Sequence, residues 1–271
     1  MPGGADIVLA MVDIHCHILP GLDDGARDME TSVEMCRVAA EDGIEATVCS
    51  MHANDQYAFD PELVQKTIDQ VMSQTGGKPR LYPGCDFHLS YQNITNALRE
   101  PKRYTINHGS YLLVEFADFA VPPNIDEVFF QFRSRGMIPI ITHPERNPWL
   151  MGARHKLFEW VDAGALVQVT AGSLTGRFGE RAGRFSEWLL EHRMLHFVAT
   201  DAHNVNDRPP RLTPAYERVA KDFGRDVADR IFRENPRAAL ESQEINAEPP
   251  VAPSAPRKQT FLGRLAATFR R

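Results

Sequence analysis

The sequence predicts an α/β fold in which seven parallel strands form a closed or nearly closed barrel, and three observations support this class. Seven strand-like runs alternate with helix-like segments along the 271 residues, a pattern typical of parallel strands joined by helical crossovers. No G-x-G-x-x-G motif opens the first helix and no G-x-x-x-x-G-K-[ST] motif is present, so the open sheets that cradle phosphates lose support. Acidic residues and histidines recur where the strands end, which is where barrel enzymes carry their chemistry.

The predicted elements follow one another in a regular order. The strand-like runs cover residues 7–14, 45–51, 80–85, 111–116, 137–142, 165–170 and 195–200. The helix-like segments cover residues 29–42, 61–73, 124–135, 154–163, 178–192 and 214–223. Asp60 and Pro61 are typical of a helix start, and Gly43 is typical of a helix end.

Three segments are expected along the chain. Residues 1–245 would form the barrel domain, and the proline-rich residues 246–256 would form an extended linker. Residues 257–271 hold five basic and no acidic residues, and Phe261, Leu265 and Phe269 would share one side of a helix. This basic amphipathic tail is expected to contact an anionic membrane surface, the alternative being a disordered, solubilising tail.

Composition narrows the cellular setting. No apolar run approaches the roughly 20 residues of a membrane helix, and no basic segment precedes an apolar run at the N-terminus. The four cysteines form no C-x-x-C pair, and none has an arginine six positions later. A cytoplasmic protein is therefore expected, without the thiolate phosphate loop of cysteine-based phosphatases. The net charge of −6 argues against a partner made of nucleic acid.

The strongest signal is a set of candidate metal ligands at six of the seven strand ends. The first run leads into Asp13-Ile14-His15-Cys16-His17, where alternate side chains share a face. The full set is His15, His17, Asp24, His52, Asp86, Glu115, His143, Asp201 and His203. Nine ligands are too many for one ion and suit two or three ions that share carboxylates. Imidazoles and carboxylates without thiolates favour manganese, iron or zinc.

Other polar residues receive supporting or neutral interpretations. Asp13 and His88 are expected to orient ligands rather than bind metal. Cys16 alternates to the opposite face and is expected to pack in the core. The remaining histidines are interpreted as solvated or capping residues: His108, His155, His192 and His196.

Four motifs together resemble the PHP (polymerase and histidinol phosphatase) family. They are Asp13 to Gly25 (DIHCHILPGLDDG), His143 to Asn147 (HPERN), Gly172 to Gly179 (GSLTGRFG) and Asp201 to Asn204 (DAHN). The resemblance extends from about Met11 to about Leu240. It implies a distorted seven-stranded TIM-like barrel of the PHP type with a three-metal centre, usually of manganese.

The resemblance also implies a distribution of ligands. His15, His17, Glu115 and Asp201 would hold one ion, and Glu115 would bridge to a second ion held with His143 and Asp86. Asp24, His52 and His203 would hold the third, and Arg146 and Arg208 would bind phosphate. Family members often carry glutamate where this sequence has Asp86, so the way in which Asp86 binds metal is open.

Within that family the motifs look most like the bacterial metal-dependent protein tyrosine phosphatases encoded with capsule and exopolysaccharide export systems. The implied substrate is the phosphotyrosine-bearing tail of a membrane-anchored tyrosine autokinase, at the inner membrane. The residues support phosphoryl chemistry independently, since arginine forks match phosphate oxygens and metal ions can activate water without a covalent phosphoenzyme.

Three other functions stay open from the residues alone. A small-molecule phosphatase of the histidinol phosphatase type would use the same site. A metal-dependent hydrolase of C–N or lactone bonds would usually need a lysine-derived bridge or fewer ions. A non-catalytic scaffold with a vestigial site would not need a complete ligand set.

Overall fold

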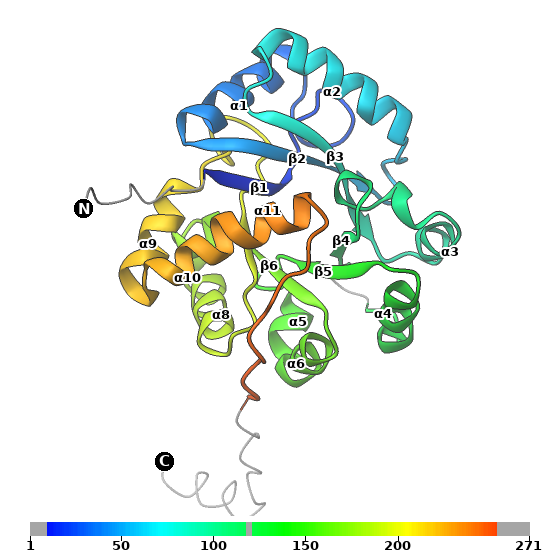
Figure 1. The fold of residues 1–271 in the computed structure, drawn as a ribbon, viewed down its shortest axis with the longest axis vertical. Helices are drawn as coiled ribbons and strands as arrows, with labels where there is room; N and C mark the ends of the chain where they lie inside the picture. Colours follow the sequence, from blue (N-terminus) through cyan, green and yellow to red (C-terminus); the bar gives the residue numbers. More distant parts are fainter. Residues whose placement is uncertain (1–9, 118–120, 254–271) are drawn as a thin grey trace, which may run out of the picture.

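Seven parallel strands form a nearly closed barrel in the computed structural model, which describes residues 10–117 and 121–253 (Figure 1). Each strand pairs with the next one along the chain. The strands are β1 (Met11–Cys16), β2 (Ile44–Ala53), β3 (Arg80–His88), β4 (Tyr111–Glu115), β5 (Ile138–Thr142), β6 (Leu166–Thr170) and β7 (Phe197–Ala199). The first and last strands meet where Asp201 donates its N–H to the His15 carbonyl at 2.8 Å and His17 donates to the Ala202 carbonyl at 2.9 Å. The predicted fold class is confirmed.

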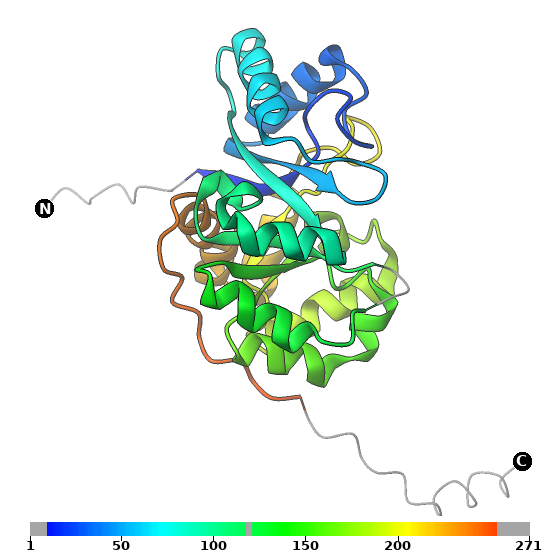
Figure 2. The same cartoon turned by 90° about the vertical axis from the view of Figure 1, so that its right-hand side faces the viewer.

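Helices surround the barrel (Figures 1 and 2). They are α1 (Met29–Glu41), α2 (Pro61–Thr75), α3 (Tyr91–Arg99), α4 (Ile125–Ser134), α5 (Pro148–Gly152), α6 (Arg154–Asp162), α7 (Ala171–Leu174), α8 (Gly179–Glu191), α9 (Thr213–Phe223), α10 (Arg225–Asp229) and α11 (Asn235–Leu240). Short turns η1 (Pro101–Arg103), η2 (Ile106–His108) and η3 (Arg230–Glu234) complete the set. As predicted, Asp60 caps α2 by accepting the N–H groups of Glu62 and Leu63. The described part of the chain has no helix that is both long enough and apolar enough to span a bilayer.

An apolar cluster closes one end of the barrel. It joins side chains from strands on all sides, including Val12, Leu113 and Phe197, to Ala239 and Leu240 of α11. Helix α11 crosses in front of the strands in Figure 1. The apolar core fills this end and α11 covers it. A polar site can therefore lie only at the opposite end, which holds the C-terminal ends of the strands.

The structure differs from the sequence-based boundaries at the ends of two strands and in several helices. Strands β2 and β3 extend to Ala53 and His88, so His52 and Asp86 lie within strands rather than after them. Helix α3, the short helices α5 and α7, and the helices after residue 224 were not predicted. Helix α3 is only nine residues long, is mostly polar and buries only Ala97, and η3 is a π-turn whose period departs from 3.6 residues.

The segment after α11 runs along the body of the protein. Glu248 pairs with Arg230 at 2.6 Å and with Arg193 at 3.4 Å, and Val251 donates its N–H to the His192 carbonyl at 2.8 Å. The first part of the expected linker is thus fastened to the barrel. Residues 7–9 of the first predicted strand and the tail 257–271 lie outside the described residues.

Candidate metal centre

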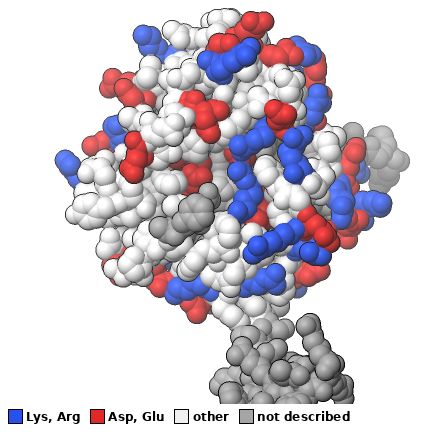
Figure 3. Space-filling view, turned by 180° about the vertical axis from the view of Figure 1, so that it is seen from behind, with Lys and Arg blue, Asp and Glu red and all other residues white. Residues whose placement is uncertain are grey.

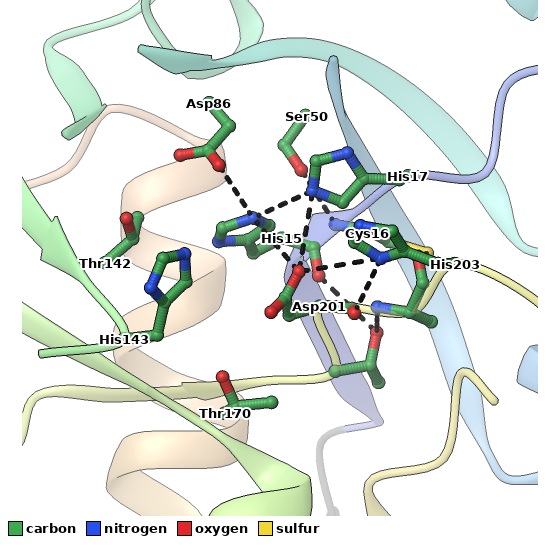
Figure 4. Close-up of polar contacts among 12 residues, drawn as sticks. His15, Cys16, His17, Ser50, Asp86, Thr142, His143, Thr170, Asp201 and His203 are labelled. Atoms are coloured by element: carbon green, nitrogen blue, oxygen red, sulfur yellow. Dashed lines mark hydrogen bonds and ion pairs between the residues drawn. The ribbon is translucent and has the colours of Figure 1, made fainter. Parts of the chain in front are cut away.

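His15 and His17 point their Nε2 atoms toward the same place from the end of β1 (Figure 4). These two Nε2 atoms are 3.2 Å apart. On the far side of each ring, His15 Nδ1 lies 3.0 Å from Gln168 Oε1 and His17 Nδ1 lies 2.7 Å from Asp23 Oδ2. Metal-binding histidines are commonly oriented in this way, with one ring nitrogen held by the protein and the other left for the ion.

The register of β2, β3 and β4 brings the next candidate ligands together. His52 lies opposite Asp86, and His88 lies opposite Glu115. Asp86 Oδ2 is 3.5 Å from His15 Nε2 and 3.4 Å from His52 Nδ1, while Glu115 Oε2 is 3.5 Å from His52 Nδ1. Both Asp86 oxygens and His52 Nδ1 are buried without a hydrogen-bond partner. Buried polar atoms of this kind call for a partner, and a cation would supply one.

The ends of β5 and β7 add His143 and Asp201, both with positive backbone φ angles of 32° and 50°. His143 Nε2 is 3.6 Å from Glu115 Oε1. Asp201 Oδ1 is 3.6 Å from His15 Nε2 and 3.5 Å from His17 Nε2. Non-glycine residues in this left-handed region are strained, and such strain gathers at functional sites. The backbone therefore turns at both strand ends to aim these side chains at the cluster.

Asp24 and His203 complete the cluster at its outer side. Asp24 Oδ1 is 3.4 Å from His52 Nε2 and 3.5 Å from His203 Nε2. The loop that carries Asp24 folds back tightly on β1, since a Cβ atom on Gly25 would lie only 2.0 Å from the His17 carbonyl oxygen. Only glycine allows this approach.

The structure thus assembles all nine predicted ligands at one end of the barrel. Among the described residues, three groups have donor atoms within 4.8 Å of one another: His17, Asp24, His52 and His203; His15, His17 and Asp86; His52, Asp86 and Glu115. Divalent ions fit these groups, because imidazole and carboxylate donors converge and the unpaired atoms of Asp86 and His52 lie among them. Asp86 groups with His15 and His17 and is shared between two groups, while Glu115 groups with His52 and Asp86. The distribution of ions implied by the resemblance stays a prediction.

Burial and neighbouring charges shift the pKa values of ligands in this cluster. Burial, followed by the charge of Asp86, raises the pKa of Glu115 to about 9. Burial, followed by the Arg146 guanidinium, lowers the pKa of His143 to about 3. A neutral imidazole is the form that binds metal, and added cations would relieve the repulsion between the carboxylates.

Asp13 and His88 lie beside the donor groups. Asp13 accepts hydrogen bonds from the Thr200 N–H at 3.0 Å, from the Thr200 hydroxyl, and from the His15 N–H at 3.3 Å. Burial raises the pKa of Asp13 to about 6. His88 Nε2 lies 3.4 Å from Glu115 Oε2. Cys16 is buried in an apolar cluster between β1 and α1, which confirms its predicted packing role.

Two arginines flank the cluster. Arg146 and Arg208 both contact Asp201 Oδ2, Arg208 at 2.6 Å, and the Arg146 guanidinium lies 4.6 Å from the centre of the Phe178 ring. Their side chains remain 28% and 24% exposed, so both can still reach an incoming anion. In the view of Figure 3, lysine and arginine side chains gather in a band down the middle of the face.

Three buried or half-buried polar residues of the site were missed from the sequence. Asp23 and Gln168 orient the β1 histidines, as described above. Glu145 is buried, and its Oε1 accepts the Ser173 hydroxyl at 2.7 Å and the Thr170 N–H at 3.0 Å, which ties the turn before Arg146 to the end of β6. Each residue could have been noticed in the sequence. Asp23 stands next to Asp24, Gln168 interrupts an apolar strand, and Glu145 lies inside the HPER motif.

Comparison with known proteins agrees with this site. Residues 11–241 match the family model of capsular polysaccharide synthesis, CpsB/CapC. The chain is 35% identical to the tyrosine-protein phosphatase YwqE of Bacillus subtilis over 244 residues, covering 89% of this chain and 95% of that protein. It is 30% identical to the putative tyrosine-protein phosphatase CapC of Staphylococcus aureus, with the same coverage.

A solved structure supports the same relationship. It belongs to a set of crystal structures of YwqE from Bacillus subtilis and CpsB from Streptococcus pneumoniae, which are described as unique metal-dependent tyrosine phosphatases. The TM-score is 0.83 at 34% identity, and the match covers 90% of this chain and all of the other. The chain belongs to the CpsB/CapC family of capsular polysaccharide synthesis.

Proposed function

We propose that this chain is a metal-dependent protein tyrosine phosphatase that hydrolyses phosphotyrosine. The observation that carries the proposal is the convergence of nine imidazole and carboxylate side chains beside two arginines at the mouth of the barrel. The tyrosine phosphatases among its relatives support the choice of substrate.

Two to three divalent ions would occupy the cluster, with manganese as our first choice and iron or zinc as alternatives. His17, Asp24, His52 and His203 would hold one ion. His15, His17, Asp86 and Asp201 would hold a second ion. Asp86, Glu115 and His143 would hold a third. His52 Nδ1 also lies 3.4 Å from Asp86 Oδ2. When bound, the ions supply Lewis-acid activation of water and neutralise charge on the phosphoryl group.

The protein's own contribution is to position and bind the phosphate. Arg146 and Arg208 present planar guanidinium groups that suit two phosphate oxygens. Both contact Asp201 and stay partly exposed, so each guanidinium keeps further N–H donors for substrate. Phe178 holds the Arg146 guanidinium through its ring face.

A cysteine nucleophile is not needed for this reaction. All four cysteines are free and buried, and burial raises the pKa of the Cys36 thiol to about 12 and of the other three well above the usual range. These thiols stay protonated at neutral pH, so they cannot attack a phosphoryl group.

The partner we propose is a membrane-anchored tyrosine autokinase that controls capsule or exopolysaccharide synthesis. A cytoplasmic enzyme could reach such a kinase at the inner membrane, and residues 257–271 carry the basic and apolar residues for a peripheral contact. Cosedimentation with anionic liposomes tests this contact. A chain ending at residue 253 retains the contacts of Glu248 and Val251, and equal pelleting of both forms would contradict the anchor.

A panel of substrates tests the activity itself. The metal-loaded full chain should release phosphate from phosphotyrosine peptides faster than from phosphoserine peptides or histidinol phosphate. Preference for histidinol phosphate would instead favour the small-molecule phosphatase.

A further inference from the structure

A second cavity opens beside the metal cluster, and none of the nine ligands lines it. It has a volume of about 180 Å³ and lies between the turn after β6 and the start of α9. Its apolar lining consists of Ala171, Gly172, Phe178, Pro209, Pro214 and Ala215. Three threonines and three arginines form the rest: Thr170, Thr175, Thr200, Arg177, Arg208 and Arg211. An apolar cavity of about 150 Å³ can hold a benzene molecule, so this cavity has the size of one aromatic ring.

Both phosphate-binding arginines connect the cavity to the cluster. Arg208 lines it directly, and its Nη2 reaches Asp201 Oδ2 at 2.6 Å. Phe178 lines it as well, and its ring supports Arg146, which contacts the same Asp201 oxygen. A phosphate held between these arginines would therefore stand at the edge of the cavity, with room for its ester substituent inside.

Local packing keeps the cavity wall in place. A Cβ atom on Gly172 would lie 2.9 Å from Phe178 Cε2 and 3.2 Å from Arg177 Cδ. The missing side chain lets Phe178 lie close over the turn after β6. This close approach fixes Phe178 in the lining of the cavity, and aromatic rings favour contact with a second ring.

The neighbouring hollow is chemically different. It has a volume of about 230 Å³ and is lined by Glu115, His143, Arg146 and Asn147 among others. Carboxylate, imidazole and amide groups suit metal, water and phosphate rather than a hydrocarbon ring. The hollow lined by Glu115 and His143 therefore suits the phosphoryl group, and the cavity lined by Phe178 is left for its ester substituent.

We infer that the cavity between Phe178 and Pro209 binds the aromatic ring of the substrate's phosphotyrosine. This inference rests on the proposed phosphatase function and deepens it, because it assigns a basis for preferring aryl over alkyl phosphate esters. Burial of part of a phenyl ring is worth about tenfold in affinity.

Two phosphonates that compete with p-nitrophenyl phosphate for the metal-loaded enzyme test whether the cavity binds an aromatic ring. Benzylphosphonate carries a ring and ethylphosphonate does not, and neither can be hydrolysed, so differences in leaving-group reactivity do not enter. The inhibition constant for benzylphosphonate should be about tenfold lower than that for ethylphosphonate. Ala215→Leu, which adds bulk at a buried cavity wall, should remove this preference and leave ethylphosphonate unchanged.

Matched variants keep the test decisive. Glu217→Leu adds a leucine to the same helix at an exposed position outside the cavity and should keep the preference. Thr175→Phe adds bulk at another lining residue, in the turn after β6, and serves if Ala215→Leu does not fold. Equal inhibition of the original enzyme by both phosphonates would overturn the ring site while the phosphatase proposal stands. Failure of both to bind would overturn the phosphatase proposal and the ring site with it.

Discussion

Asp86 lies directly across the β2–β3 ladder from His52, and its Oδ2 atom is 3.4 Å from His52 Nδ1. Both Asp86 oxygens are buried without a hydrogen-bond partner, and the same carboxylate faces His15 at 3.5 Å. Asp86 therefore connects two of the three donor groups and is the one carboxylate that these groups share.

The first prediction concerns this shared carboxylate. Asp86→Asn keeps the size of the side chain but removes its charge, so metal content and turnover should both fall, turnover by at least about 100-fold, since even residues that only orient ligands cost about 10–100-fold. Elemental analysis beside kinetics with p-nitrophenyl phosphate measures both. Asp86→Glu is the matched control and should retain metal. An asparagine variant with normal metal content would remove Asp86 from the ligand set.

The second prediction separates phosphate binding from metal binding. Arg146→Ala should leave the metal content near normal and weaken inhibition by inorganic phosphate about 10- to 100-fold, the range for hydrogen bonds between charged groups. Arg184→Ala removes an exposed arginine that pairs with Glu180 on α8 and should change neither quantity. Unchanged kinetics in the Arg146 variant would exclude it from substrate binding.

The ligand pattern could be predicted from the sequence because strand ends of a parallel barrel meet at one rim. His15, His143 and Asp201 each follow an apolar run, so their convergence needs no knowledge of distances. The sharing of Asp86 could not be predicted, because it depends on the register of β2 with β3. His196 was also interpreted wrongly as solvated or capping a helix: it is buried, and its Nδ1 accepts the Val167 N–H at 3.1 Å.

The unpredicted helices have a different cause. The segment from α10 to α11 contains a π-turn and Pro236 near the start of α11, and neither gives a regular apolar period. These helices pack against the barrel through Ile231 and Phe232 among others. Such tertiary contacts cannot be predicted from the local sequence.

The third prediction follows from the close approach of Gly25 to β1. Gly25→Ala would place a methyl group 2.0 Å from the His17 carbonyl oxygen, so the loop that carries Asp24 must move. Metal content should fall, and the free energy of unfolding should drop by about 1–3 kcal/mol, the usual cost of overpacking. Gly152→Ala is the control, since no atom lies within 4 Å of its added Cβ. Equal urea midpoints for both variants would contradict the steric argument.

The fourth prediction concerns pH and His196. Burial lowers the pKa of His196 from 6.5 to about 4 in the folded state, so only the unfolded chain gains this proton between those values. The folded state should lose stability as the pH falls below 6.5, by about 2 kcal/mol at pH 5 from this residue.

Urea unfolding at pH 7 and pH 5 measures that loss against a variant without the titrating group. His196→Asn keeps a hydrogen-bond acceptor but does not titrate, so its loss between the two pH values should be smaller by about 2 kcal/mol. Identical losses in the two proteins would show that His196 does not contribute.

The most direct test of the account follows bound metal and phosphate release together. The full chain is stripped with a chelator, alkylated with iodoacetamide, and titrated with Mn²⁺ while a phosphotyrosine peptide is hydrolysed. We expect no turnover without metal, recovery as two to three ions bind per chain, and no effect of alkylation, because all four cysteines are buried. Phosphotyrosine hydrolysis by the metal-free chain, or metal binding without any hydrolysis, would contradict the assignment of this cluster as a phosphatase centre.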